Sequence, residues 1–234
     1  MKIKLMSFNT QHCNNYLEQK IDFDIMAKTV LSLGADFVGL NEMRGAGENA
    51  EYTAQTETLA ALTGMENYYF AKAIDVPDGG PYGNAFISKL AITEVENIPI
   101  PDPVVKKYDG YYESRCLLRA KLECGLTVLV VHMGLNPDER ESAVKTVIEN
   151  MPKEKCILMG DFNAEPDDCI LDPIRALMRD TAELFDEEKK SFPSDKPRMK
   201  IDYIFATRDV KVLSADIPTA VASDHRPYIA EIEI

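Results

Sequence analysis

Carboxylate and amide side chains follow several apolar runs of the chain, where buried strands are expected to end. Glu42 follows one such run after a single asparagine, and Asp161 comes directly after another run, with Asn163 two residues later. Because alternate residues of a strand share a face, Asp161 and Asn163 are expected to point the same way. Near the C-terminus, the polar pair Asp224-His225 precedes the last apolar run. Strand ends of this kind present chemistry to a loop-lined cleft.

Hard oxygen ligands suit Mg²⁺ or Mn²⁺, which proteins bind through one or two carboxylates together with water and substrate phosphate. Zn²⁺ is less favoured, because the chain has only 3 histidines and no HxxxH-type pair. A single carboxylate is more often a capping or solvated residue. The recurrence of the pattern at several strand ends predicts a magnesium or manganese site.

The elements expected to position these residues alternate between strands and helices at both ends of the chain, with hairpins between. Helices are expected over Phe23–Leu33, Thr56–Leu62 and Glu139–Met151. Strands are expected over Ile3–Phe8, Asp36–Leu40, Tyr68–Ala73, Asn84–Ser88, Arg115–Leu122, Leu126–Val131, Cys156–Met159, Tyr203–Phe205, Val210–Leu213 and Tyr228–Ile232. This order predicts an α+β fold, a four-layer α/β/β/α sandwich of two mixed sheets packed face to face with helices outside.

Length and charge restrict the possible functions. The 234 residues are expected to form one catalytic domain, 1–234, with no apolar run long enough to span a membrane. The net charge of −13 argues against a broad basic face for nucleic acid, although a bound cation can reverse the local field. The start of the chain is not typical of a signal peptide, and the 5 cysteines form no CxxC pair, so reduced thiols in the cytoplasm are expected.

Seven short motifs in this order resemble the endonuclease/exonuclease/phosphatase superfamily, which includes deoxyribonucleases, abasic-site endonucleases, sphingomyelinases, inositol polyphosphate phosphatases and deadenylases. They are Met6-Ser7-Phe8-Asn9, Leu40-Asn41-Glu42, Tyr82-Gly83-Asn84-Ala85, Val131-His132, Gly160-Asp161-Phe162-Asn163-Ala164-Glu165-Pro166, Ile201-Asp202-Tyr203-Ile204 and Ser223-Asp224-His225-Arg226-Pro227. Each alone is a weak pattern, whereas the ordered set is specific. One departure is Asn41, where the family usually has Gln.

The resemblance implies a role for each residue that binds the cation or the attacking water. Glu42 is expected to hold the metal with Asn9 and Asp224. Asp161 is expected to act as the base or as a second metal ligand, and to position the water together with Asn163. Asn9 has the alternative of a turn residue at the end of its strand.

The resemblance also implies a set of groups that contact the phosphate. His225 is expected to bind a phosphate oxygen while Asp202 accepts its other ring proton and favours the imidazolium. His132 is expected to bind the phosphate from the opposite side, Arg115 to contact it through its guanidinium, and Asn163 to contact it as well. In the alternative readings, His132 is a core histidine, Arg115 pairs with Glu113 or Asp109 on the surface, and Asp202 caps a turn.

The substrate depends on loops over the metal site, expected at Arg44–Gln55, Asp75–Gly83 and Pro99–Ser114. A compact basic cluster is expected at Lys196, Arg198 and Lys200. His12 lies close to Asn9 but is expected to be a loop histidine.

The leading hypothesis is a metal-dependent hydrolase of phosphodiesters or phosphomonoesters by in-line attack of water. Its expected substrate is a nucleotide-like or other small phosphorylated molecule, or a single-stranded nucleic acid, and no obligate protein partner is evident. The alternatives are an endonuclease or exonuclease on DNA or RNA, a lipid-headgroup phosphodiesterase, and a catalytically inactive binding module on the same fold.

Overall fold

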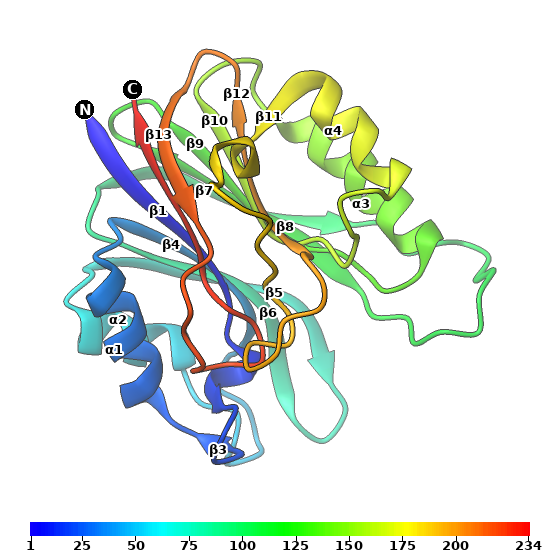
Figure 1. Cartoon of the computed structure of the whole chain (residues 1–234). Helices are drawn as coiled ribbons and strands as arrows, with labels where there is room; N and C mark the ends of the chain where they lie inside the picture. The colour runs from blue at the N-terminus through cyan, green and yellow to red at the C-terminus, as the bar shows by residue number, and fades with distance from the viewer.

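Two six-stranded β-sheets pack face to face in the computed structural model, which describes residues 1–234. Helices α1 (Phe23–Leu33) and α2 (Gln55–Thr63) cover the outer face of one sheet. Helices α3 (Pro137–Asn150) and α4 (Asp172–Leu177) cover the outer face of the other (Figure 1). The four-layer α/β/β/α sandwich expected from the sequence is therefore confirmed.

The first sheet has the order β13-β14-β1-β4-β6-β5 and the second the order β11-β12-β10-β9-β8-β7. The strands of the first are β1 (Lys2–Asn9), β4 (Phe37–Arg44), β5 (Asn67–Val76), β6 (Gly80–Ser88), β13 (Lys211–Asp216) and β14 (Tyr228–Glu233). Those of the second are β7 (Ile92–Ile100), β8 (Arg115–Leu122), β9 (Thr127–His132), β10 (Cys156–Asp161), β11 (Met178–Asp180) and β12 (Asp202–Thr207). A separate pair joins β2 (Asn14–Asn15) to β3 (Lys20–Ile21).

The helix ends follow local capping chemistry. Asp22 caps the start of α1 by accepting a hydrogen bond from the backbone N–H of Ile25 at 3.1 Å, and Gly34, with φ of 66°, caps its end. A capping box between Asn136 and Glu139 begins α3 two residues before the expected start. The longest helix has 14 residues, and none combines the length and the apolar character that crossing a membrane requires.

The apolar core has three parts, and the central one lies between the sheets. It contains 22 buried residues, including Leu5, Phe37 and Phe86 from the first sheet and Val130 and Met159 from the second. The other two parts lie between each sheet and its helices. Alternating side chains of one strand thus pack against the opposite sheet or against the helices, which fixes the positions of the strand ends.

Three expectations about the connecting segments are wrong. The segment expected as the loop Asp75–Gly83 continues the strands of a long hairpin, so that only residues 77–79 form the turn. The sequence pattern does not predict the edge strand β7, because a bulge between Ile92 and Glu94 interrupts its alternation. The loop expected over Pro99–Ser114 is therefore shorter, at 101–114. The sequence pattern also does not predict α4 and β11.

Candidate active site

Three polar residues lie side by side across the second sheet because of the strand register. Asp161 at the end of β10 is paired with His132 of the parallel strand β9 and with Asp202 of the antiparallel strand β12. Gly160, just before Asp161, has φ of 143°, and a Cβ there would overlap the carbonyl oxygen of Val131. The local backbone therefore requires glycine next to the central carboxylate.

The first sheet contributes Asn9 and Glu42 from the ends of two parallel strands. Asn9 of β1 is paired with Asn41 of β4, and Glu42 follows at once. A bulge between Leu40 and Met43 disturbs the pairing of β4 with β6. Glu42 lies in this bulge with φ of 60°, a conformation that redirects its side chain.

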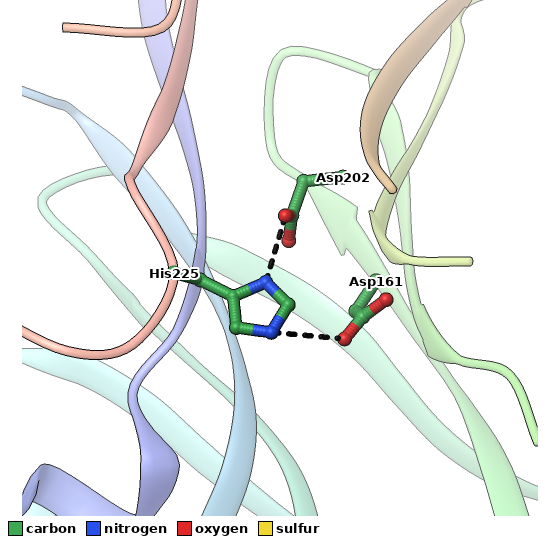
Figure 2. A group of neighbouring side chains, drawn as sticks. All are labelled: Asp161, Asp202 and His225. Carbon is green, nitrogen blue, oxygen red and sulfur yellow. Dashed lines mark hydrogen bonds and ion pairs between the residues drawn. The ribbon is translucent and has the colours of Figure 1, made fainter. Parts of the chain in front are cut away.

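His225 lies between two carboxylates, as Figure 2 shows. Its Nδ1 is 2.8 Å from Oδ2 of Asp202, and its Nε2 is 3.6 Å from Oδ2 of Asp161. All three side chains are at most 5% exposed. Phe192 packs on the imidazole, with ring centroids 4.8 Å apart. The expected pairing of Asp202 with His225 is thus present in the geometry.

Burial and charge act in opposite directions on this group. Burial alone would lower the pKa of His225, but the Asp202 and Asp161 carboxylates raise it to about 10. Burial raises the pKa of Asp161 to about 7, while the charge of His225 opposes this rise. The two carboxylates therefore favour an imidazolium at His225 at neutral pH, and a pKa of about 7 gives Asp161 the proton affinity that suits a general base.

Glu42 and Asp224 are two carboxylates that could hold a cation. Burial raises the pKa of Glu42, and the neighbouring Asp224 carboxylate raises it further. Burial also raises the pKa of Asp224. A divalent cation held by these two carboxylates would supply the missing countercharge, and its preference for hard oxygen fits this donor set.

Asn9 holds Glu42 through its side-chain amide. Nδ2 of Asn9 donates to Oε1 of Glu42 at 2.9 Å and to Oδ2 of Asp161 at 3.1 Å. Its Oδ1 accepts from the backbone N–H of Gln11 at 3.1 Å. Asn9 therefore links carboxylates from the two sheets. Its side-chain amide would have to rotate, so that Oδ1 takes the place of Nδ2, before the oxygen could act as the expected metal ligand.

Asp161, Asp202 and His225 also bring ligand atoms within 4.8 Å of one another. Two of these atoms, however, already form the contact between Asp202 and the imidazole. A metal bound there would displace the charge-assisted hydrogen bond that holds His225 protonated. The geometry favours this group as a proton-handling unit beside the cation rather than as the cation's main ligands.

His132 and Asn163 complete the cluster. Nε2 of His132 is 3.6 Å from Oδ2 of Asp161, the oxygen that His225 also approaches. Nδ2 of Asn163 donates to the carbonyl oxygen of Met133 at 2.9 Å, and its backbone N–H donates to Oδ1 of Asp161 at 3.0 Å. Arg115 contacts His132 and pairs with Glu113, as in the alternative reading, but its side chain is only 11% exposed and so does not lie on the surface.

Sequence reasoning missed the role of a buried asparagine pair that joins the two sheets. Nδ2 of Asn41 donates to Oδ1 of Asn84 at 2.8 Å and to the carbonyl oxygen of Val131 at 3.0 Å. Its Oδ1 accepts from the backbone N–H of Asp161 at 3.1 Å. Nδ2 of Asn84 donates to the carbonyl oxygen of Cys116 at 2.8 Å. The available signal was the polar residue itself, since an amide inside an apolar strand needs partners.

Two residues singled out in the sequence lie elsewhere. Lys200 is not part of an exposed basic cluster: it is 7% exposed, with Nζ 3.5 Å from Oδ2 of Asp180 and 3.3 Å from the ring centroid of Tyr203. The expected basic cluster is therefore wrong for Lys200. His12 lies in a short turn with φ of 48°, and its carbonyl oxygen accepts from Nε2 of Gln55 at 2.8 Å.

The model of the Endonuclease/Exonuclease/phosphatase family matches residues 6–225, a range that contains all the residues of this cluster. The chain belongs to this family. Family members are hydrolases that act on phosphoesters, which confirms the resemblance at the level of the family and the enzyme class. No curated protein matches the sequence of this family member.

Solved structures of other proteins share the fold of this family member. An endonuclease/exonuclease/phosphatase from Beutenbergia cavernae has a TM-score of 0.78 and 19% identity, over 100% of this chain and 72% of the other. A mannosyl-6-phosphatase from Bacteroides thetaiotaomicron has a TM-score of 0.77 and 18% identity, over 99% and 100%. The D. rerio TDP2 complexed with a single-strand DNA product has a TM-score of 0.69 and 17% identity, over 100% and 99%.

Proposed function

We propose that this protein is a divalent-cation-dependent phosphoesterase that hydrolyses small phosphorylated substrates by in-line attack of water. The observation that carries the proposal is the buried contact of His225 with Asp202 and Asp161, next to Glu42 and Asp224. Such a group combines a fixed positive charge, a candidate base and a cation site, which are the elements that phosphoryl transfer needs.

The residues divide the reaction between them. Glu42 and Asp224 would hold Mg²⁺ or Mn²⁺, which when bound polarises a phosphoryl oxygen and offsets charge on the leaving group. Asp161 would orient the attacking water and accept its proton, with Asn163 fixing the carboxylate through its backbone N–H. His225 would donate from Nε2 to a phosphate oxygen, because its Nδ1 already faces Asp202.

Activity should require the cation. Bis-p-nitrophenyl phosphate and p-nitrophenyl phosphate are expected to be hydrolysed with Mg²⁺ or Mn²⁺, and not in excess chelator. Comparison of the two esters distinguishes a diesterase from a monoesterase. Glu42→Gln should weaken Mn²⁺ binding measured by calorimetry, because a neutral amide attracts the cation less than a carboxylate does. Full activity in chelator would remove the cation from the proposal.

A hollow beside the cluster supports a small substrate. It has a volume of about 450 Å³ and includes Asn163, Arg140 and the carboxylates Glu165, Asp167 and Asp168. Carboxylates accept hydrogen bonds from hydroxyl groups but repel a second phosphate. The net charge of −13 acts in the same direction. Both features favour a phosphorylated hydroxyl compound or a nucleotide over a long polyanion.

A substrate screen should therefore rank small phosphoesters first. We expect sugar phosphates, inositol phosphates and nucleotides to be turned over faster than oligoribonucleotides, phospholipid headgroups or supercoiled plasmid. Phosphate release and gel analysis measure the two groups, and the Asp161→Asn protein, purified in parallel, excludes contaminating phosphatases. Efficient plasmid nicking at physiological salt would reverse this ranking and favour a nuclease.

A further inference from the structure

Arg115 is held between a carboxylate and a histidine. Its Nη1 is 2.7 Å from Oε1 of Glu113 and 2.9 Å from Nδ1 of His132. The side chains of Arg115 and Glu113 are 11% and 13% exposed, so this ion pair is largely removed from water. The guanidinium therefore connects Glu113 to a ring that reaches the central carboxylate of the site.

The contact with Arg115 determines which ring nitrogen of His132 carries a proton. A guanidinium stays protonated in proteins and has no acceptor, so its Nη1–H must donate to Nδ1 of His132. Nδ1 then offers its lone pair, and the proton lies on Nε2. A proton on Nδ1 would instead face the Nη1–H of Arg115 across 2.9 Å. Nε2 is the nitrogen 3.6 Å from Oδ2 of Asp161.

Asn163 is the competing neighbour of the ring. Its Nδ2 lies 3.3 Å from Nε2 of His132, a longer contact than that of Arg115 and one made by a neutral donor. Nδ2 already donates to the carbonyl oxygen of Met133 at 2.9 Å. Because a neutral imidazole accepts at one nitrogen only, the shorter and charge-assisted contact decides the tautomer.

Glu113 is the carboxylate that keeps Arg115 in this place. It is the one carboxylate within ion-pair distance of the guanidinium. Oε1 of Glu113 and Nε of Arg115 are both buried and neither makes a hydrogen bond, so the two residues are held together as a buried charge pair. The backbone N–H of Glu113 donates to Oε1 of Glu139 at 3.1 Å, which ties the residue to the start of α3. Without Glu113, a buried guanidinium would have no countercharge at this end and would leave the ring.

We propose that Glu113 is a positioning residue: it holds Arg115 against Nδ1 of His132 and so fixes the tautomer with the proton on Nε2. His132 then presents an N–H donor toward the phosphate position beside Asp161. Arg115 acts mainly on His132 rather than on the phosphate itself. The inference rests on the proposed phosphoesterase function, but the tautomer is measurable without any substrate.

The test is a long-range ¹H–¹⁵N correlation spectrum of the whole protein. The chain has only 3 histidines, so His12, His132 and His225 can be assigned by substituting each in turn. We expect His132 to show a pyrrole-type Nε2 and a pyridine-type Nδ1. In Glu113→Ala this pattern should change to a mixture of tautomers, with a smaller change in the isosteric Glu113→Gln, which also serves if the alanine variant does not fold.

Kinetics and a matched control complete the test. Removing a residue that orients a substrate-binding group typically lowers activity roughly 10–100-fold, and we expect this loss in kcat for Glu113→Ala, with Glu113→Gln between it and wild type. Glu96→Gln is the control, because Glu96 of β7 pairs at 2.8 Å with Arg119, which lies on the same strand as Arg115, but the Glu96 side chain is 49% exposed. It should leave both the spectrum and kcat unchanged.

Two results would overturn the proposal. One is a wild-type His132 with its proton on Nδ1. The other is an unchanged tautomer in both Glu113 variants, even with lower thermal stability, which would make Glu113 only a structural partner of Arg115. If no phosphoester were hydrolysed under any condition, the proposed function would fail while the spectrum still decided the role of Glu113.

Discussion

Replacing Asp161 with Asn is expected to lower kcat by about 10²–10⁴-fold, the usual range for loss of a general base. The amide has the same shape but does not take the proton of the attacking water. It also ends the ion pair with His225, whose Nε2 lies 3.6 Å away. KM should change little, because water positioning acts mainly in the transition state. Steady-state kinetics on an activated phosphoester measures both constants.

Stability separates this catalytic role from a structural one. Burial raises the pKa of Asp161 to about 7 from an ordinary value near 4, so in the metal-free protein its ionisation favours the unfolded state as pH rises through this window. Asp161→Asn removes that ionisation. Metal-free variant protein at pH 8 should therefore resist urea at least as well as wild type.

A matched aspartate provides the control for Asp161. Asp209 follows the other end of β12, where its Oδ2 accepts from the backbone N–H of Lys155 at 2.9 Å. Asp209→Asn is expected to keep wild-type kcat. An Asp161→Asn protein with unchanged turnover would remove Asp161 from the mechanism, and a large loss of stability with the loss of rate would indicate a structural role.

The site was predictable from sequence where a residue lies at a strand end within a short motif. His132, Asp161 and Asp202 are examples: each ends or begins a buried strand, and strand register alone makes them neighbours. The helix Phe23–Leu33 was predictable to the residue, because Asp22 caps one end and Gly34 the other. In these cases the local signal and the tertiary structure agree.

The remaining features depend on contacts between residues distant in sequence. Nothing local shows that Asn41 bonds to Val131 of the opposite sheet, 90 residues away. The direction of the Asn9 amide and the burial of Lys200 against Tyr203 are also set by packing between elements. The bulge in β7 interrupts the alternation of apolar and polar residues, so that the sequence of this edge strand is typical of a loop.

His225 and Asp202 are expected to act as one unit. His225→Ala and Asp202→Asn should each lower kcat by about 10²–10⁴-fold, and the double variant should be little worse than the worse single variant. The reason is the 2.8 Å contact between Nδ1 and Oδ2, through which Asp202 holds the imidazole in place and keeps it charged. Rates for the four proteins form a double-mutant cycle that measures the coupling.

The pH dependence gives an independent measure of the same coupling. Since the carboxylates raise the pKa of His225 to about 10, wild type should keep its activity on the alkaline side until near that pH. Deprotonation removes the donor, so the rate falls above the pKa. Without the Asp202 carboxylate, only Asp161 and Asp224 oppose the effect of burial on the pKa of His225, so this pKa falls. The fall in rate should therefore move toward neutral pH in Asp202→Asn.

The alternative is that His225 serves only to pack against Phe192, whose ring centroid is 4.8 Å from its own. Phe192→Leu tests that alternative, because it alters the packing and leaves the contact with Asp202 in place. We expect it to change kcat little and to leave the alkaline limb of the pH profile where it is. Losses that multiply in the double variant, together with an unmoved alkaline limb in Asp202→Asn, would show that the two residues act separately. The cation site at Glu42 and Asp224 would then have to account for the rate without a protonated imidazole beside it.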